Sequence, residues 1–366
     1  MRSNKKGWLL PSNLAKQSKN KNNEQDCEHR EIWFPGKNMV NIAINGLGRI
    51  GRHVLKIGLE RGINFVAVND LTDSKTLAYL LKYDSIYGIY DKKIEAGNEL
   101  LKIGNNKIKV LSIKEPEKLP WKKLNVDIVI ESTGLFTSKE LAVKHTQAGA
   151  KKVIVTAPCK GNIKTIVPGV NNNFLKKDDI LISVASCTTN CLAPVVKVLH
   201  ENFKIKKGLM TTVHGYTADQ KLQDAPHKDL RRGRAAAENI VPTTTGASIA
   251  VTEVIPELKG KLNGMALRAP VASGSITDLT AELQKSVSVN EINNAFKKSA
   301  QKELKGILEY TEEPIVSRDI IGNSHSSIFD ASLTQVIDNL VKVFAWYDNE
   351  YGYSHRVIDV VKMMKV

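Results

Sequence analysis

The sequence predicts an α/β fold built on a doubly wound parallel sheet, and three observations support this prediction. Alternating apolar residues over Val40–Ile44 predict a strand, which leads directly into a glycine-rich turn, Gly46–Gly51. A segment with helical periodicity follows, and the apolar run Phe65–Val68 predicts a second strand. A strand, a helix and a strand in this order form a βαβ unit with parallel strands. Short apolar runs at Val126–Ile130 and Lys152–Val155 predict two more strands of the same sheet.

The glycine-rich turn has the G-x-G-x-x-G spacing of a dinucleotide-binding loop. Glycines permit a tight turn there and let the backbone approach a pyrophosphate at the N-terminus of the following helix. Asp70 follows about 20 residues later, at the end of the second predicted strand, where a carboxylate can accept hydrogen bonds from an adenosine ribose. This context favours a dinucleotide site. Thr133 and Thr156 end the later strands and are candidates for the same site, with ordinary turn chemistry as the alternative.

Composition and charge limit the class of protein. The chain has 366 residues, 42% hydrophobic and 25% charged, which is typical of a soluble protein with about two domains and excludes a disordered or fibrous chain. The longest apolar runs are strand-sized, so we expect no membrane span. A net charge of +15 favours anionic ligands. Four cysteines without a metal-binding spacing indicate a reducing, cytoplasmic setting and no metal. Residues 1–38 predict a disordered N-terminal extension, unless the start codon is assigned wrongly.

Cys187 is the candidate nucleophile. It follows a predicted buried strand, Ile180–Ala185, and begins a segment of helical periodicity. A helix N-terminus stabilises a thiolate, so we expect the thiol pKa to be lowered. An inert buried thiol is the alternative, and this is our interpretation of Cys191. Among eight histidines, His214 is the candidate base, because it ends the strand-like segment Leu209–Val213 and precedes a turn.

Several segments together closely resemble the phosphorylating glyceraldehyde-3-phosphate dehydrogenases of type I, and the likeness runs from Met39 to the C-terminus. The segments are Asn45–Arg52, Val68–Asp73, Ser186–Pro194, Pro242–Ala247 and Trp346–Tyr353. The resemblance implies a glycolytic oxidoreductase. Its cysteine attacks glyceraldehyde 3-phosphate, and hydride passes to NAD as a thioester forms. Inorganic phosphate then releases the product, 1,3-bisphosphoglycerate.

The same resemblance assigns the site residues. The catalytic pair is Cys187 and His214. The cofactor-binding residues are Gly46, Gly48, Arg49, Ile50, Gly51, Asp70, Lys114, Thr133, Thr156, Asn349 and Tyr353. The substrate phosphate is assigned to Thr217, Asp219 and Arg268, and the attacking phosphate to Ser186, Thr188, Arg232, Thr245 and Gly246. The choice among Arg231, Arg232 and Arg234 stays open, and a solvated basic run or a nucleic-acid patch is the alternative for these arginines.

The resemblance also implies the architecture. A Rossmann-type NAD-binding domain is expected over residues 39–186 and 349–366, with the last segment returning as a helix. An α+β catalytic domain with a mostly antiparallel sheet is expected over 187–348. Its loop Tyr216–Ile240 is expected to line the cofactor site of a neighbouring subunit in a homotetramer.

One departure and two alternatives qualify this interpretation. Ala225 replaces a leucine that is common in NAD-specific members, which leaves NADP tolerance open, although Asp70 still favours NAD. The first alternative is a dehydrogenase of erythrose 4-phosphate with the same nucleophile. The second is a secondary RNA-binding role, suggested by the charge of +15 and the Lys- and Asn-rich extension.

Overall fold

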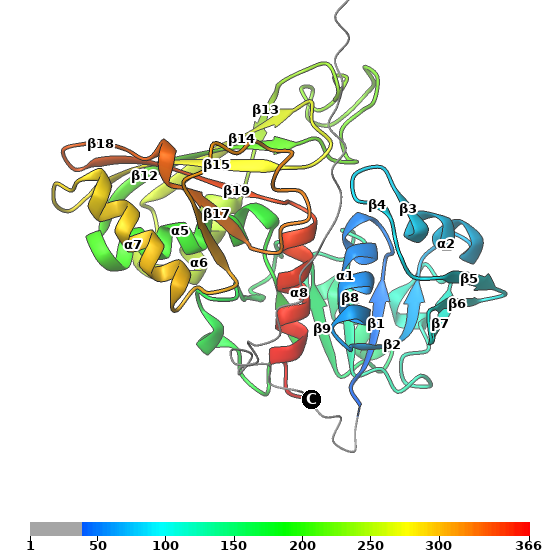
Figure 1. The fold of residues 1–366 in the computed structure, drawn as a ribbon. Helices are drawn as coiled ribbons and strands as arrows, with labels where there is room; N and C mark the ends of the chain where they lie inside the picture. Colours follow the sequence, from blue (N-terminus) through cyan, green and yellow to red (C-terminus); the bar gives the residue numbers. More distant parts are fainter. Residues whose placement is uncertain (1–38) are drawn as a thin grey trace, which may run out of the picture. The chain divides into compact units, whose positions relative to one another are not determined.

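The computed structural model describes residues 39–366, and the expectation for residues 1–38 lies outside the described residues. Residues 40–366 form one compact unit that contains two large sheets (Figure 1). The predicted domain boundaries within this unit stay a prediction. Within residues 39–366, no helix is long and apolar enough to cross a membrane.

The first sheet confirms the predicted doubly wound arrangement. Its nine strands have the order β10-β11-β9-β8-β1-β2-β7-β6-β5, and all neighbours from β10 to β7 are parallel. Only the edge strands β6 and β5 are antiparallel. The strands are β1 (Asn41–Asn45), β2 (Asn64–Asn69), β5 (Ile94–Gly97), β6 (Leu100–Ile103), β7 (Asn106–Leu111), β8 (Ile128–Glu131), β9 (Lys152–Val155), β10 (Lys164–Thr165) and β11 (Leu181–Ser183).

The strand order of this sheet reverses between β1 and β8, because the chain first builds outward through β2 and then returns to the other side of β1. In open α/β sheets, ligands bind beyond the carboxyl ends of the strands at such a switch point. The helices on this half of the chain are α1 (Arg49–Glu60), α2 (Ser74–Lys82), α3 (Lys139–Ala142), α4 (Lys144–Gln147) and α8 (Tyr351–Met363), with a small β3 (Tyr83–Asp84) and β4 (Gly88–Ile89) hairpin.

Helix α8 is the predicted return of the chain to the first sheet. It packs against α1, and its apolar positions Val357, Ile358 and Val361 belong to the same core cluster as the strands of this sheet (Figure 1). The helix is shorter than the predicted segment 349–366, since it begins at Tyr351 and ends at Met363.

The second sheet is mostly antiparallel, as predicted. Its order is β13-β14-β12-β15-β19-β17-β16, with β18 paired to β19, and only the pairs β12–β14 and β16–β17 are parallel. Helices cover one face, where they share a large apolar core with the strands (Figure 1). The elements are β12 (Ile205–Gly215), β13 (Val241–Thr244), β14 (Leu262–Ala269), β15 (Ser275–Leu283), β16 (Leu308–Thr311), β17 (Ser327–Asp330), β18 (Gln335–Ile337), β19 (Leu340–Tyr347), α5 (Cys187–Phe203), α6 (Ala247–Val254) and α7 (Val289–Gln301).

Several strand bounds differ from the prediction for local reasons. The strand predicted at Ile180–Ala185 ends at Ser183, because Ala185 has a left-handed backbone, φ 54°, that turns the chain toward α5. The strand predicted to end at His214 extends one residue further, because β14 pairs with β12 as far as Gly215. His214 therefore lies within a strand. The loop Tyr216–Ile240 contains no helix or strand, as expected.

Candidate active site

Cys187 occupies the first position of α5, as predicted. Ser186 caps the helix, since its Oγ accepts a hydrogen bond from the backbone N–H of Thr189 at 3.1 Å. The Asn190 side chain donates to the carbonyls of Val184 and Ser186, at 2.8 and 3.0 Å. These bonds fix the turn before the helix, so the thiol is held at the helix N-terminus.

The two candidate catalytic side chains meet within the second half of the molecule, one from the start of α5 and the other from β12. The Sγ of Cys187 lies 3.4 Å from Nε2 of His214, which is within hydrogen-bonding distance for sulfur. Nδ1 of His214 lies 2.7 Å from the carbonyl oxygen of Gly215 and 2.6 Å from Nη1 of Arg268. The register of β12 against β14 places Arg268 directly beside His214.

These contacts define two possible proton arrangements on the imidazole. A carbonyl oxygen only accepts, so the Gly215 contact requires a proton on Nδ1 and leaves Nε2 free to take the proton of Cys187. A guanidinium only donates, so the Arg268 contact requires a bare Nδ1 and a proton on Nε2 facing the sulfur. The site therefore offers an acceptor or a donor to the sulfur, depending on the tautomer.

Burial sets the protonation of this pair. Burial and the positive charge of Arg268 lower the pKa of His214 to about 4, so the imidazole is neutral near pH 7. Burial also raises the pKa of the Cys187 thiol, although Arg268 and hydrogen bonding with Thr188 oppose the shift. The expected lowering of this pKa is therefore wrong. The expectation included the helix N-terminus but not the packing of protein around a sulfur that stays only partly exposed.

A second layer of hydroxyl groups lies behind the thiol. The hydroxyl of Tyr347 is 2.8 Å from Oγ1 of Thr188 and 2.9 Å from Oγ1 of Thr212, and Tyr347 is 1% exposed. Thr188, assigned to the attacking phosphate, is therefore already hydrogen-bonded. Sequence reasoning missed Tyr347 as a site residue, although it lies in the Trp346–Tyr353 segment that carries the resemblance.

Three residues assigned to the two phosphates, Thr217, Asp219 and Arg232, are connected by hydrogen bonds. The Asp219 carboxylate accepts from Thr217 Oγ1, and its Oδ2 pairs with Nη1 of Arg232 at 2.7 Å. Nε of Arg232 donates to Thr243 Oγ1 at 2.9 Å. Within the basic run, Arg234 instead pairs with the exposed Asp224 at 2.9 Å. These contacts favour Arg232 as the arginine of this site.

Thr245 and Gly246 lie at the N-terminus of α6. Gly246 is the N-cap residue, and a Cβ added there would meet no atom within 4 Å, so an anion could approach the backbone. The Thr245 hydroxyl accepts from the N–H of Ala247 at 3.2 Å.

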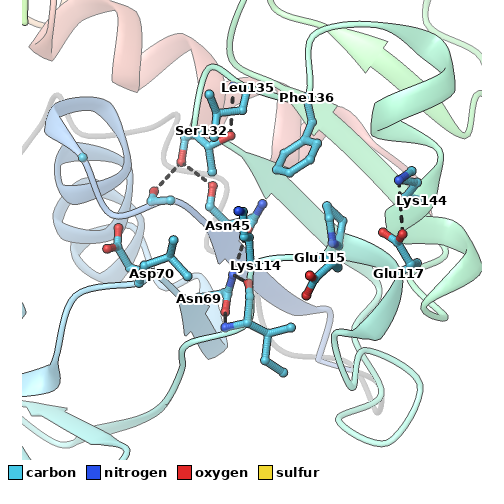
Figure 2. A pocket seen from close by; sticks show the side chains of 16 residues that line it. Asn45, Asn69, Asp70, Lys114, Glu115, Glu117, Ser132, Leu135, Phe136 and Lys144 are labelled. Carbon is cyan, nitrogen blue, oxygen red and sulfur yellow. Dashed lines mark hydrogen bonds and ion pairs between the residues drawn. The ribbon is translucent and has the colours of Figure 1, made fainter.

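A cavity of about 610 Å³ opens at the switch point of the first sheet (Figure 2). Figure 2 shows Asp70 at one side of this cavity and the ion pair of Lys144 and Glu117 at the other. Of the predicted cofactor residues, its lining includes Gly46, Gly48, Asp70, Lys114 and Thr133. The remaining ones lie outside this lining: Arg49, Ile50, Gly51, Thr156, Asn349 and Tyr353.

The backbone of the glycine-rich turn suits a dinucleotide. Gly46 has φ +93°, a conformation that favours glycine. A Cβ on Gly51 would lie 2.1 Å from the Gly46 carbonyl oxygen, so the turn closes only with glycine there. At Gly48 nothing lies within 4 Å of such a Cβ, which leaves the backbone open toward the cavity. The turn therefore provides the close backbone approach that a pyrophosphate requires.

Arg49 does not direct its charge toward the cavity. Its Nη1 contacts Oδ2 of Asp84 at 2.6 Å, and its Nε contacts Oε1 of Glu350 at 2.9 Å. Burial opposes ionisation of Glu350, but contacts with His53 and Arg49 outweigh it and lower the pKa of Glu350 to about 2. The guanidinium is thus neutralised by two carboxylates, and a cofactor contact from Arg49 would come from its backbone.

Four other predicted cofactor residues are held by the fold. Both carboxylate oxygens of Asp70 accept backbone N–H groups, from Leu47 at 2.8 Å and Thr72 at 3.0 Å, so the side chain is fixed at the cavity. Asn349 Oδ1 accepts from Gly274 N and Ser275 Oγ, which leaves its Nδ2 as the remaining donor. The hydroxyl of Tyr353 donates to the carbonyl of Ala185, and Thr156 donates to that of Glu131.

Fold and site together define a class of protein. A dinucleotide cavity at the switch point of a doubly wound sheet, together with a cysteine and a histidine in contact, is typical of nicotinamide-dependent oxidoreductases that form a covalent intermediate.

Comparison with known proteins identifies the family. The model of the glyceraldehyde 3-phosphate dehydrogenase NAD binding domain matches residues 40–139, and that of the C-terminal domain matches residues 186–349. A glyceraldehyde-3-phosphate dehydrogenase of Borreliella burgdorferi is 56% identical over 333 residues, covering 89% of this chain and 99% of that protein. One of Geobacillus stearothermophilus is 57% identical over 324 residues, covering 88% and 97%. One of Mycolicibacterium smegmatis is 55% identical over 334 residues, covering 89% and 98%.

The chain belongs to the glyceraldehyde 3-phosphate dehydrogenase family and is an NAD-dependent oxidoreductase. The predicted resemblance and the predicted cofactor are confirmed. The findings do not favour the alternative with erythrose 4-phosphate.

Proposed function

We propose that this chain oxidises glyceraldehyde 3-phosphate to 1,3-bisphosphoglycerate with inorganic phosphate as the second substrate, and that Cys187 and His214 perform the chemistry. The observation that carries the proposal is the 3.4 Å contact between Sγ and Nε2 at the N-terminus of α5. Both side chains come from elements whose ends are fixed by hydrogen bonds. The sulfur and the imidazole are therefore preorganised for the reaction.

The first step forms a bond between Sγ of Cys187 and the aldehyde carbon. The thiol proton passes to Nε2 of His214 as the sulfur attacks, and His214 then gives this proton to the aldehyde oxygen to form a hemithioacetal. NAD, when bound, supplies the hydride acceptor for the oxidation to a thioester. His214 takes the hydroxyl proton of the hemithioacetal as that oxidation proceeds. A phosphate oxygen then attacks the thioester carbonyl, the carbon–sulfur bond breaks, and the thiolate of Cys187 is released.

The cluster around Asp219 supports a role in anion binding. Arg232 and Arg268 are the two cations of the site, and Thr217 adds a hydroxyl group beside Asp219. A planar guanidinium binds phosphate oxygens through two parallel hydrogen bonds. We assign Arg268 to the substrate phosphate and Arg232 to the attacking phosphate. Binding of the attacking phosphate requires Arg232 to exchange part of its contact with Asp219.

Discrimination between NAD and NADP is assigned to Asp70. Its carboxylate is held by two backbone N–H groups and cannot turn away from a 2′-phosphate without breaking both. The repulsion between the two anions therefore favours NAD. Ala225 lies in the loop Tyr216–Ile240, where its N–H donates to the Gly233 carbonyl, and we assign to it only a secondary influence on this choice.

A homotetramer is part of the proposal. Large apolar side chains are exposed on β12 of the second sheet, on α6 and on the loop Tyr216–Ile240, and such surface is typical of a subunit interface. They are Leu209, Leu222, Leu230, Ile240 and Ile249. We also propose a cytoplasmic location, because a catalytic thiol works only while it stays reduced.

The decisive experiment measures cofactor reduction by the purified chain with glyceraldehyde 3-phosphate and inorganic phosphate. NAD and NADP are tested in parallel, and Cys187→Ser is compared with Cys159→Ser, which changes a thiol outside the site. We expect phosphate-dependent NAD reduction that is lost in Cys187→Ser and retained in Cys159→Ser. Turnover with erythrose 4-phosphate but not with glyceraldehyde 3-phosphate would contradict the proposed substrate.

A further inference from the structure

A chain of buried polar side chains lies directly behind the cofactor cavity and takes no part in the proposed chemistry. Nε1 of Trp121 lies 3.1 Å from Nδ1 of His145, and Nε2 of His145 lies 3.0 Å from Oε2 of Glu131. The exposed fractions of these residues are 0% for Trp121 and His145 and 1% for Glu131. Solvent therefore cannot satisfy any of the three groups.

The direction of each hydrogen bond is fixed by chemistry. An indole N–H only donates, so Nδ1 of His145 accepts and the imidazole proton lies on Nε2, facing Glu131. The Glu131 carboxylate accepts three further bonds, from Asn45 Nδ2 at 2.6 Å, Thr133 N at 2.8 Å and Thr133 Oγ1 at 2.5 Å. Each group around the carboxylate is thus a donor, and Trp121 selects the tautomer that makes His145 one of them.

The groups held by Glu131 form the wall of the cavity. Asn45 ends β1 and Thr133 follows β8, and both line the cavity of Figure 2. Oδ1 of Asn45 accepts from Nδ2 of Asn69, which ends β2, at 2.7 Å. One carboxylate therefore connects the ends of three parallel strands at the switch point. Thr133 also limits the glycine-rich turn, because a Cβ on Gly46 would lie 2.7 Å from the Thr133 nitrogen.

A contribution to folding stability does not explain why these buried polar residues are present. Among residues 39–366, the one ion-pair partner within 4.0 Å of Glu131 is His145, and no lysine or arginine is that close. A buried carboxylate without a cation is desolvated at a cost that its hydrogen bonds offset only in part, and well-packed apolar residues of similar size are often at least as stable. The hydrogen bonds instead fix the orientation of Asn45 and Thr133. Apolar side chains in the same place could not orient these two polar residues.

We propose that Glu131 and His145 are a positioning pair that sets the affinity for NAD by holding Asn45 and Thr133 in the cavity wall. The inference rests on the assignment of this cavity to NAD. The pair touches neither Cys187 nor His214 in any contact of the structure, so its effect is expected on cofactor binding and not on the chemical steps.

The test compares His145→Leu with His145→Gln in the full chain. Leucine removes both hydrogen bonds, whereas a glutamine amide can donate to Glu131 and accept from Trp121. For His145→Leu we expect KM for NAD and the directly titrated Kd to rise about tenfold or more, with kcat at saturating NAD within about twofold of the parent. For His145→Gln we expect most of the affinity to return.

A second buried histidine provides the matched control. His200 is 9% exposed, and its Nδ1 accepts from the backbone N–H of Ile205 in the other half of the molecule. His200→Leu should lower the thermal midpoint without changing KM for NAD. If His145→Leu does not fold, Trp121→Phe removes only the donor that selects the tautomer, and a smaller rise in KM with unchanged kcat is expected.

Three results would overturn the inference while leaving the proposed function intact. They are an unchanged Kd for NAD in His145→Leu, a fall in kcat as large as the rise in KM, and a His200→Leu variant that raises KM equally. Failure of the parent chain to bind NAD would instead refute the assignment of the cavity, and the inference with it.

Discussion

The cofactor cavity and the thiol site are built in different ways. The turn of the cavity comes from one short segment, Gly46–Gly51, and its closest approach, between Gly51 and the Gly46 carbonyl oxygen, lies within that segment. The thiol site joins Cys187 with His214, which is 27 positions away, and His214 with Arg268. It also includes the contact of Thr188 with Tyr347, two residues that are 159 positions apart. A local motif fixes the first region, whereas the register of the second sheet fixes the other. Changes in the two regions should therefore separate into effects on binding and effects on chemistry.

Cys187→Ser is expected to have the largest effect. A serine hydroxyl beside a neutral His214 is a far weaker nucleophile than a thiol, so kcat should fall about a thousandfold or more. The Kd for NAD, measured by titration, should stay within about threefold of the parent. A variant that loses NAD binding to the same degree as turnover would show that the two regions are not separable.

The buried His214 should also make stability depend on pH. Its pKa is lowered from 6.5 to about 4 in the folded protein. Between these values the unfolded chain binds more protons, so the free energy of unfolding increases with pH. The contribution of His214, about 3 kcal/mol, is present above pH 6.5 and is lost as the pH falls toward 4.

Denaturant unfolding of the parent and of His214→Gln between pH 4 and 7 measures this contribution. The slope should be smaller in the variant. His355, whose pKa is also lowered to about 4, is present in both proteins and cancels in the difference. Equal slopes would mean that His214 is not the buried neutral base that the geometry indicates.

Gly51→Ala tests whether the glycine-rich turn of the cofactor cavity requires glycine at this position. The added Cβ would lie 2.1 Å from the Gly46 carbonyl oxygen, so the turn must open. Overpacking of this kind costs about 2 kcal/mol, and we expect a lower thermal midpoint together with weaker NAD binding. Gly48→Ala is the matched control, because a Cβ there meets nothing within 4 Å in the protein. It should preserve the thermal midpoint while still hindering the approach of a pyrophosphate.

Asp70→Asn changes which cofactor the cavity accepts. The amide keeps the shape of the side chain but removes the negative charge that a 2′-phosphate would meet. The ratio of kcat/KM for NADP to that for NAD should rise about tenfold or more. Cofactor competition with the purified variant measures this ratio, and no change in it would transfer the discrimination to the loop that contains Ala225.

The difference between the two regions also explains what the sequence could predict. The turn Gly46–Gly51, the strand ending near Asp70 and the start of α5 at Cys187 depend on neighbours in the chain, and all three are found where expected. The raised pKa of the thiol was not predictable in this way, because it comes from atoms that the fold brings around the sulfur. The same holds for the contact between Arg268 and His214, which exists only because β12 and β14 pair in one register.

Tyr347→Phe is expected to have the smallest effect and tests how far the thiol site extends. Its hydroxyl links Thr188 beside the thiol to Thr212 on β12, and phenylalanine keeps the ring while removing both contacts. The loss of a neutral hydrogen-bond partner costs about 1 kcal/mol, so kcat should fall about fivefold as Thr188 becomes free to rotate. The Kd for NAD should stay unchanged, because Tyr347 does not line the cavity. A fall in the thermal midpoint with unchanged kcat would instead limit the role of Tyr347 to packing, and the thiol site would then end at Thr188.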